Sequence, residues 1–273
     1  MPEVAPYTRL LAKLTPLSRV AVAFSGGVDS TLLLHASVEA LGVDNVLAIT
    51  ASADAFPQEE LGFCQAFTAA RGIRHHLIHL DPLAREEVRT NDPRRCYFCK
   101  QFIFTHCLQI ARDAGFDLLI DGTNADDALD YRPGTQAARE LGVRSPLEEA
   151  GLGKDTIRDL SRQAGLPGWD KPPLTCYLTR FPYGTTITAE RLQQVRRCEE
   201  FLASRNFSGF RVRYHGEVAR LELNPDDFRR LLDPALRGEI VATCRQNGFT
   251  YVALDLEGYR QGSLNPAGLS ATL

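Results

Sequence analysis

Several features of membrane, secreted and nucleic-acid-binding proteins are missing from this sequence of 273 residues. No apolar run approaches the roughly 20 residues that cross a membrane, and the first residues lack the charged and apolar regions of a secretory signal. The net charge of −3 gives the molecule no general attraction to nucleic acid. We therefore expect a cytoplasmic protein with no membrane or nucleic-acid partner, in which any basic site is local.

The cysteine count does not suit a disulfide-bonded protein. Seven cysteines, an odd number in a chain of this length, favour a reducing compartment over a disulfide framework. Four of them lie in helical patterns, where cysteine most often serves as a small buried apolar residue. We predict inert core thiols at Cys64, Cys107, Cys198 and Cys244.

The order of apolar segments predicts an α/β fold. Short apolar runs at residues 20–24, 46–50, 75–80 and 118–121 indicate strands, with helical patterns between them. This alternation is typical of a doubly wound parallel sheet, in which ligands bind beyond the carboxyl ends of the strands.

The pattern changes near residue 185. A charged amphipathic helix at 189–206 is followed by a hairpin at 210–223, helical segments at 225–232 and 234–247, and a strand at 251–256. We predict two domains, an α/β domain over residues 1–184 and a smaller α+β domain over residues 185–273.

The stretch 25–30 has the sequence SGGVDS and lies between the first strand and a helical pattern. Paired glycines at a helix start let backbone N–H groups face an anion, and the helix dipole attracts negative charge. Asp29 would repel phosphates unless a cation lies between them, which indicates Mg²⁺. A simple glycine turn is the alternative interpretation. The Gly-Lys-Ser/Thr ending of a Walker loop is absent.

This stretch resembles the SGGxDS loop of the ATP pyrophosphatase (PP-loop) superfamily, whose members split ATP between the α- and β-phosphates. The resemblance implies an ATP site and a catalytic role for Asp29, which would hold Mg²⁺. The contacts expected with ATP are Ser25, Gly26, Gly27, Asp29, Ser30, Ser52, Gly122, Thr123 and Asn124. The acidic stretch after the fourth strand contains Asp126, Asp127 and Asp130. It is either a solvated turn or a segment that holds metal or positions Arg132 near phosphate.

The remaining cysteines differ from the core thiols. Cys96 and Cys99 form a C-x-x-C flanked by cations, and Cys176 lies in a proline-rich loop between Lys171 and Arg180. Such a pair indicates a redox site, half of a zinc site or part of an iron–sulfur cluster. A structural zinc site needs four ligands, and no second C-x-x-C is present to complete it. A thioredoxin-like pair is expected to open a helix in a protein that has no ATP loop. Three cysteines suit a [4Fe–4S] cluster with one open iron, although Cys176 as an inert core thiol is the alternative.

Beyond these motifs, nearly the whole chain resembles one PP-loop family, the ATP-dependent sulfur transferase of nickel-pincer nucleotide biosynthesis known as LarE. The resemblance rests on residues 25–30, 122–134, 171–184 with its RFPYG, and FRVR at 210–213, and the last two blocks are the specific ones. Strand alternation puts Arg211 and Arg213 on one face of the hairpin. The resemblance implies adenylation of pyridinium-3,5-biscarboxylic acid mononucleotide and formation of a thiocarboxylate for lactate racemase maturation. The sulfur comes from a cysteine, which becomes dehydroalanine in some members, or by way of a cluster.

The same resemblance implies roles for individual residues. It makes Cys176 the catalytic sulfur residue, and the C-x-x-C favours the type in which Cys96, Cys99 and Cys176 hold a cluster. Substrate binding is implied for Arg180, Arg211 and Arg213. A metal site is implied near Glu199, Glu222 and Asp227, and a homo-oligomer is expected.

Two rival interpretations share these features. A PP-loop tRNA thiolase would use the same ATP loop and three cysteines, but it needs an extended basic surface that a net charge of −3 does not favour. A nucleotide-binding regulator without catalysis would leave Asp29, the three cysteines and the arginines without a purpose.

Overall fold

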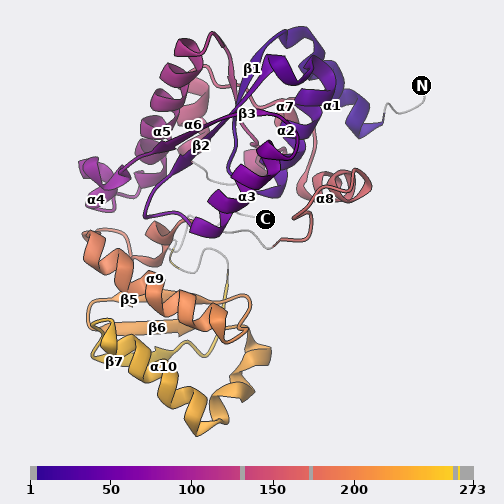
Figure 1. Cartoon of the computed structure of the whole chain (residues 1–273). Helices are drawn as coiled ribbons and strands as arrows, with labels where there is room; N and C mark the ends of the chain where they lie inside the picture. The colour runs from indigo at the N-terminus through magenta and orange to yellow at the C-terminus, as the bar shows by residue number, and fades with distance from the viewer. Residues whose placement is uncertain (1–4, 130–132, 172–174, 261–263, 265–273) are drawn as a thin grey trace. The chain divides into compact units, whose positions relative to one another are not determined.

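The computed structural model describes residues 5–129, 133–171, 175–260 and 264. They form two compact units (Figure 1). The first contains Met1–Pro82 and Arg94–Leu174, and the second contains Leu83–Pro93 and Thr175–Thr272. The second unit thus begins ten residues before the predicted boundary at 184/185 and includes a segment that interrupts the first. The segment is held there because Asn91 Nδ2 donates to the carbonyls of Phe181 and Pro182, and the Gly184 N–H donates to the Asn91 carbonyl.

The first unit is built on a four-stranded parallel sheet in the order β3-β2-β1-β4. Its strands are β1 (Val20–Ala23), β2 (Val46–Ser52), β3 (Arg74–His79) and β4 (Leu119–Ile120). The predicted fold class is confirmed, and each predicted strand is present with small shifts at its ends. Only β4 is much shorter than expected.

The two faces of this sheet follow from strand alternation. Val20 and Val22 point into a core shared with α1, α2, α3, α7 and α8. Ala21 and Leu47 point the other way, into a core shared with α5 and α6. Figure 1 shows these helix groups on opposite sides of the strands. The helices are α1 (Pro6–Leu14), α2 (Val28–Leu41), α3 (Gln58–Ala69), α5 (Arg95–Asp113), α6 (Pro133–Glu140), α7 (Pro146–Glu149) and α8 (Lys154–Gln163).

The second unit contains a small sheet in the order β5-β6-β7. Strands β5 (Arg211–His215) and β6 (Val218–Glu222) form the predicted antiparallel hairpin, and β7 (Tyr251–Leu254) runs parallel to β6. The unit also holds α4 (Glu86–Arg89), α9 (Ala189–Ser204), the 3₁₀ segment η6 (Pro225–Leu232) and α10 (Pro234–Gln246). Helix α9 begins where the Thr188 hydroxyl accepts the Arg191 N–H at 3.3 Å.

The four cysteines predicted to be core thiols are buried. Burial raises the pKa of Cys64 and of Cys107 to about 12, which keeps both thiols protonated at neutral pH. In contrast, Cys96 is exposed, and Cys99 and Cys176 are half-buried.

Candidate functional site

The turn at residues 25–30 has the geometry of an anion site. Gly27 is the N-cap of α2, so the first N–H groups of this helix have no intrahelical acceptor. The hydroxyls of Ser25 and Ser30 lie 3.1 Å apart, and Ser30 donates to the Gly27 carbonyl at 3.1 Å. These contacts fix the turn around the helix N-terminus, where an anion is stabilised.

Two glycines allow other segments to approach this turn. Gly26 has φ +81°, and a Cβ there would lie 2.9 Å from Glu60 Oε2 and 3.0 Å from Cys64 Sγ. A Cβ on Gly122 would lie 2.9 Å from the backbone nitrogen of Ser30. The end of β4 therefore rests directly against the start of α2, as expected for a crevice at the carboxyl ends of the strands.

Other predicted ATP contacts have protein partners near this crevice. Ser52 is buried, with its hydroxyl 3.2 Å from His79 Nδ1. Thr123 donates through its hydroxyl to Asp121 at 2.8 Å, and Asn124 Oδ1 accepts the Asp126 N–H at 3.0 Å. Their contacts with ATP remain predictions.

Asp29 lies in the first turn of α2 and is paired with a lysine far away in the sequence. Lys154 Nζ lies 2.5 Å from Asp29 Oδ2. Burial raises the pKa of Asp29 above its usual value, the ammonium of Lys154 opposes this shift, and the charge of Asp127 adds to it. Oδ1 is buried and has no hydrogen bond of normal geometry from any described residue, although the Asn124 side chain is close enough to stabilise the carboxylate.

These residues fit Mg²⁺. A buried carboxylate oxygen without a hydrogen-bond donor suits a hard cation, which prefers oxygen ligands shared with phosphate. Asp29 and Asp127 are the residues that would hold it, since the charge of Asp127 acts on the Asp29 carboxylate. The magnesium site itself stays a prediction.

The acidic stretch has a structural task that the sequence did not reveal. Asp126 Oδ2 accepts the backbone N–H of Lys154 at 2.6 Å, so this carboxylate caps the N-terminus of α8. A Cβ on Gly153 would lie 2.9 Å from Asp126 Oδ1, which explains the glycine. Asp130 and Arg132 lie outside the described residues.

The pair Cys96 and Cys99 lies in the first turns of α5, a helix of 19 residues. The pair therefore opens a helix, as a thioredoxin-like pair would. The predicted ATP loop is then the remaining argument against a thioredoxin-like site. Arg95 Nη2 lies 3.9 Å from Cys96 Sγ. Because this pair belongs to the first unit and Cys176 to the second, the convergence of the three sulfur atoms stays a prediction. Within the described parts of the chain, no group of three His, Cys, Asp or Glu side chains is arranged to hold a metal ion.

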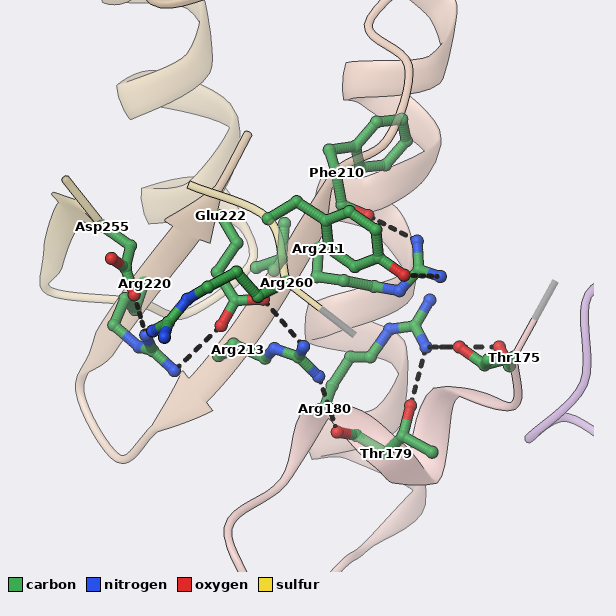
Figure 2. A network of polar contacts seen from close by, with 12 residues as sticks. Thr175, Thr179, Arg180, Phe210, Arg211, Arg213, Arg220, Glu222, Asp255 and Arg260 are labelled. Atoms are coloured by element: carbon green, nitrogen blue, oxygen red, sulfur yellow. Dashed lines mark hydrogen bonds and ion pairs between the residues drawn. The ribbon is translucent and has the colours of Figure 1, made fainter. Parts of the chain in front are cut away.

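The second unit contains a cluster of buried arginines, drawn in Figure 2. Arg180 makes a two-pronged ion pair with Glu199, with both N···O distances 2.8 Å. Its remaining Nη1 donates to the Cys176 carbonyl at 3.1 Å and to the Thr175 hydroxyl at 2.7 Å. Arg180 thus holds the backbone beside Cys176 in place. Its contact with substrate stays a prediction.

Arg213 and Arg220 share one carboxylate, that of Glu222. Arg213 Nη2 lies 2.7 Å from Glu222 Oε2, and Arg220 Nη2 lies 3.1 Å from Oε1. Glu222 is fully buried. Asp227, the third predicted metal residue of this unit, pairs with Arg230 at 3.1 Å. A metal ion at Glu199, Glu222 and Asp227 would compete with these arginines, and that site also stays a prediction.

Arg211 differs from its neighbours in the cluster. Its guanidinium donates to the Phe210 carbonyl at 2.6 Å and to the Tyr259 hydroxyl at 3.3 Å, and it has no ion pair within the described segments. Burial, followed by the positive charge of Arg180, lowers the pKa of Arg211 below its usual value, yet an arginine remains charged. Figure 2 shows the two guanidinium groups close together. Because Glu199 already pairs with Arg180, the positive charge left for an anion here is that of Arg211.

Sequence reasoning missed Lys154 as the partner of Asp29. One signal was available, because a lysine at the first position of a helix opposes the helix dipole and is unusual there.

Comparison with known proteins identifies the family. The chain is 38% identical over 265 residues, covering 97% of this chain and 95% of the other, to the pyridinium-3,5-bisthiocarboxylic acid mononucleotide synthase of Lactiplantibacillus plantarum (strain ATCC BAA-793 / NCIMB 8826 / WCFS1). It belongs to that family. The similarity runs through both units, and the family resemblance seen in the sequence is confirmed.

Two further relatives extend the comparison. The uncharacterized protein slr1717 of Synechocystis sp. (strain ATCC 27184 / PCC 6803 / Kazusa) is 43% identical over 91% of this chain and 92% of its own. The tRNA-specific 2-thiouridylase MnmA of Trichlorobacter lovleyi (strain ATCC BAA-1151 / DSM 17278 / SZ) is 34% identical over 55% of this chain and 51% of its own. No family model matches the sequence.

The similarity to the mononucleotide synthase and to the 2-thiouridylase shows that the chain is an ATP-dependent sulfurtransferase of the PP-loop superfamily. Among the helices that the structure describes, none has the length and apolar character needed to cross a membrane.

Proposed function

We propose that this enzyme converts pyridinium-3,5-biscarboxylic acid mononucleotide into a thiocarboxylate, at the expense of ATP, in nickel-pincer nucleotide synthesis. The observation that carries the proposal is the 38% identity to a mononucleotide synthase along 97% of the chain. The loop at 25–30 and the arginines of the second unit supply sites for the two anionic reactants.

The first step is adenylation. An oxygen of the substrate carboxylate attacks the α-phosphorus of ATP, the bond from that phosphorus to the bridging oxygen breaks, and pyrophosphate leaves. The N–H groups at the start of α2 and the hydroxyls of Ser25 and Ser30 bind the phosphates. Mg²⁺, when bound at Asp29 and Asp127, would offset the charge of the phosphate oxygens.

Substrate recognition falls first to Arg211. The mononucleotide carries a phosphate and two carboxylates, and a guanidinium matches either group with two hydrogen bonds. Arg211 has no carboxylate partner within the described segments, whereas Arg180 and Arg213 are held by Glu199 and Glu222.

The second step transfers sulfur. A thiolate attacks the acyl carbon, and AMP leaves with the electrons of the C–O bond. If the thiolate is that of Cys176, loss of the Cα proton and cleavage of the Cβ–Sγ bond then leave a thiocarboxylate and dehydroalanine. The alternative donor set, Cys96, Cys99 and Cys176, suits a [4Fe–4S] cluster, since these three thiols are not buried in the core. Such a cluster would present an iron atom without a protein ligand.

The test uses anaerobically purified protein with ATP, Mg²⁺ and the mononucleotide. We expect pyrophosphate as the product, and we expect Asp29→Ala to abolish its release. Release of orthophosphate, or pyrophosphate release by the variant at the normal rate, contradicts the proposal. Cys176→Ala should stop sulfur transfer and spare adenylation.

The same preparation separates the two sulfur sources. A cluster predicts iron–sulfur absorption that is lost in a Cys96→Ala/Cys99→Ala double variant together with activity. The sacrificial route predicts one turnover per chain, loss of one H₂S from Cys176 by mass spectrometry, and full activity of the double variant.

A second candidate, tRNA thiolation, is favoured by the similarity to the 2-thiouridylase over 55% of the chain. A gel shift with tRNA tests it. Binding of tRNA without conversion of the mononucleotide would favour this candidate over the first.

A further inference from the structure

The loop at 25–30 rests on a chain of hydrogen bonds that comes from the neighbouring strands. The N–H of Phe24, the residue before the loop, donates to the Ile49 carbonyl at 2.8 Å and continues the pairing of β1 with β2. The Phe24 carbonyl accepts from a side chain, the hydroxyl of Thr50 in β2, at 2.7 Å. Phe24 and Thr50 are both buried, so water cannot easily replace this donor. The last peptide before the loop is therefore oriented by Thr50.

The peptide that Thr50 orients also carries the first N–H of the loop. Because a peptide unit is planar, fixing the Phe24 carbonyl fixes the direction of the Ser25 N–H. That N–H donates to Ser30 Oγ at 3.3 Å, and Ser30 Oγ donates to the Gly27 carbonyl at 3.1 Å. The hydroxyls of Ser25 and Ser30 lie 3.1 Å apart. Thr50 thus acts, through one peptide, on the two hydroxyls that are proposed to bind phosphate.

His75 of β3 determines where the hydroxyl hydrogen of Thr50 points. A hydroxyl has one hydrogen, and that of Thr50 is given to the Phe24 carbonyl. His75 Nε2 lies 2.8 Å from Thr50 Oγ1, so Nε2 must carry a hydrogen and donate it. On the other side of the ring, Nδ1 lies 3.2 Å from the hydroxyl of Thr68 in α3, which holds the imidazole in this orientation.

Core packing alone does not explain these polar residues. Phe24 packs on Phe67 with ring centroids 5.6 Å apart, and it meets the His75 ring edge-on at 6.4 Å. An apolar side chain in place of His75 could fill this space without the cost of burying polar atoms. The histidine and the threonine are explained if the Phe24 carbonyl needs a donor in a fixed position.

We propose that Thr50 and His75 are positioning residues of the phosphate loop: His75 orients the Thr50 hydroxyl, and that hydroxyl aligns the first peptide of the loop for phosphate. Both residues act through the peptide between Phe24 and Ser25, and no bond is made or broken. The inference rests on the ATP use in the proposed function and on no property of the sulfur donor or acceptor.

The test measures the affinity for ATP and for inorganic pyrophosphate, each with Mg²⁺, by isothermal titration. Thr50→Val keeps the shape of the side chain and removes the donor. It should weaken both ligands roughly 2- to 12-fold, the range for loss of one neutral hydrogen bond. Thr50→Ser keeps the hydroxyl and should recover most of the affinity. The stoichiometry of each titration reports the folded fraction, so partial unfolding is not mistaken for weak binding.

Ser37→Ala is the matched control for a lost hydroxyl. Ser37 is buried in α2, the helix that the loop begins, and it donates to the Leu33 carbonyl of the same helix at 2.7 Å. The variant removes a buried hydrogen bond that does not reach the loop. We expect it to change neither affinity.

His75 is tested with two variants of its own. His75→Phe keeps a ring beside Phe24 but has no hydrogen to donate, so the Thr50 hydroxyl can turn away from the Phe24 carbonyl. We expect a loss of affinity in the lower part of the same range. His75→Gln keeps an amide N–H for Thr50 and should bind both ligands as wild type does. His76→Gln changes an exposed residue on the other face of β3 and should have no effect on binding.

A purely structural hydrogen bond would lower the free energy of unfolding in Thr50→Val and leave both affinities unchanged, and that outcome overturns the proposal. Failure of Thr50→Ser to recover affinity overturns it as well. Wild-type affinity in His75→Phe removes His75 from the positioning role. If wild-type protein binds neither ATP nor pyrophosphate, the ATP site of the proposed function is wrong, which distinguishes that failure from a failure of this inference.

Discussion

The two units hold their charges in different ways. Beside the loop at 25–30, each lysine touches a carboxylate once and stays partly exposed: Lys154 with Asp29, and Lys171 with Glu60 at 3.5 Å. In the second unit, the two arginine–glutamate pairs beside the cysteine loop and the hairpin are buried, with side-chain exposures of 4% and 6% for Arg180 and Glu199. The side chains of Arg213 and Glu222 are 5% and 0% exposed.

The chemistry of the two cations explains the difference. The lysine ammonium is a compact charge on a flexible stem and exchanges partners readily, whereas the arginine guanidinium is a rigid fork that matches a carboxylate in one geometry. The lysine–carboxylate pairs of the first unit are therefore the more easily exchanged. In the second unit, Arg180 and Arg213 hold the cysteine loop and the hairpin through Glu199 and Glu222, whereas Arg211 has no ion pair within the described segments.

The largest effect expected from this comparison is on stability. Glu222→Ala leaves Arg213 buried without its carboxylate, and breaking a buried pair in this way costs about 3–5 kcal/mol. Unfolding should be followed by circular dichroism together with the fluorescence of Trp169, the single tryptophan, which lies in the first unit. We expect the circular dichroism transition to move to lower urea ahead of the Trp169 transition.

Glu200→Ala is the matched control. It removes a carboxylate that pairs with Arg196 on the exposed face of α9, where such pairs contribute about 0–1 kcal/mol. If Glu222→Ala and Glu200→Ala lower the free energy of unfolding by the same small amount, the buried arginine–glutamate network does not stabilise the second unit. The contrast between the two units would then be lost.

The next effect concerns substrate affinity and separates two arginines of one strand. Arg211→Ala should weaken the mononucleotide roughly 10- to 150-fold and leave ATP affinity and the unfolding midpoint nearly unchanged. Arg213→Ala should instead lower the unfolding midpoint, because it removes the nearer of the two arginines that share the buried Glu222 carboxylate. Isothermal titration with each ligand gives both affinities. Equal losses for Arg211 and Arg213 in stability and in both ligands would mean that the paired and unpaired arginines do not differ in role.

The sequence was most informative where the decisive pattern is local. The turn at 25–30 sits between an apolar strand and a helix, and six consecutive residues were enough to predict an anion site there. Strand alternation likewise predicted that Arg211 and Arg213 share a face.

Pairings over long distances were not predictable in this way. Register decides that Arg211 lies opposite Glu222 and Arg213 opposite Arg220, and no local pattern gives that register. Lys154 meets Asp29 only because α8 is capped from the turn after β4. The segment Leu83–Pro93 belongs to the second unit through hydrogen bonds of Asn91 that composition does not reveal. These contacts depend on the tertiary fold and became visible only with it.

The smallest effect concerns the support beneath the ATP loop. His75 Nε2 lies 2.8 Å from the Thr50 hydroxyl, and that hydroxyl donates at 2.7 Å to the carbonyl of Phe24, the residue before the loop. Burial, and then the charge of His76, lowers the pKa of His75 below its ordinary 6.5. Since the unfolded chain then binds the proton more readily, stability should be unaffected by His75 above pH 6.5 and should fall as the pH drops below it.

The variant His75→Gln keeps a hydrogen-bonding amide but cannot titrate. Its loss of stability between pH 7.5 and 5.5, about one unit on either side of that value, should therefore be smaller than that of wild type. His76→Gln removes only the second cause and should lie between the two. Trp169 fluorescence in urea gives the unfolding free energy at each pH, and equal pH slopes for wild type and His75→Gln would show that the loop's support does not titrate.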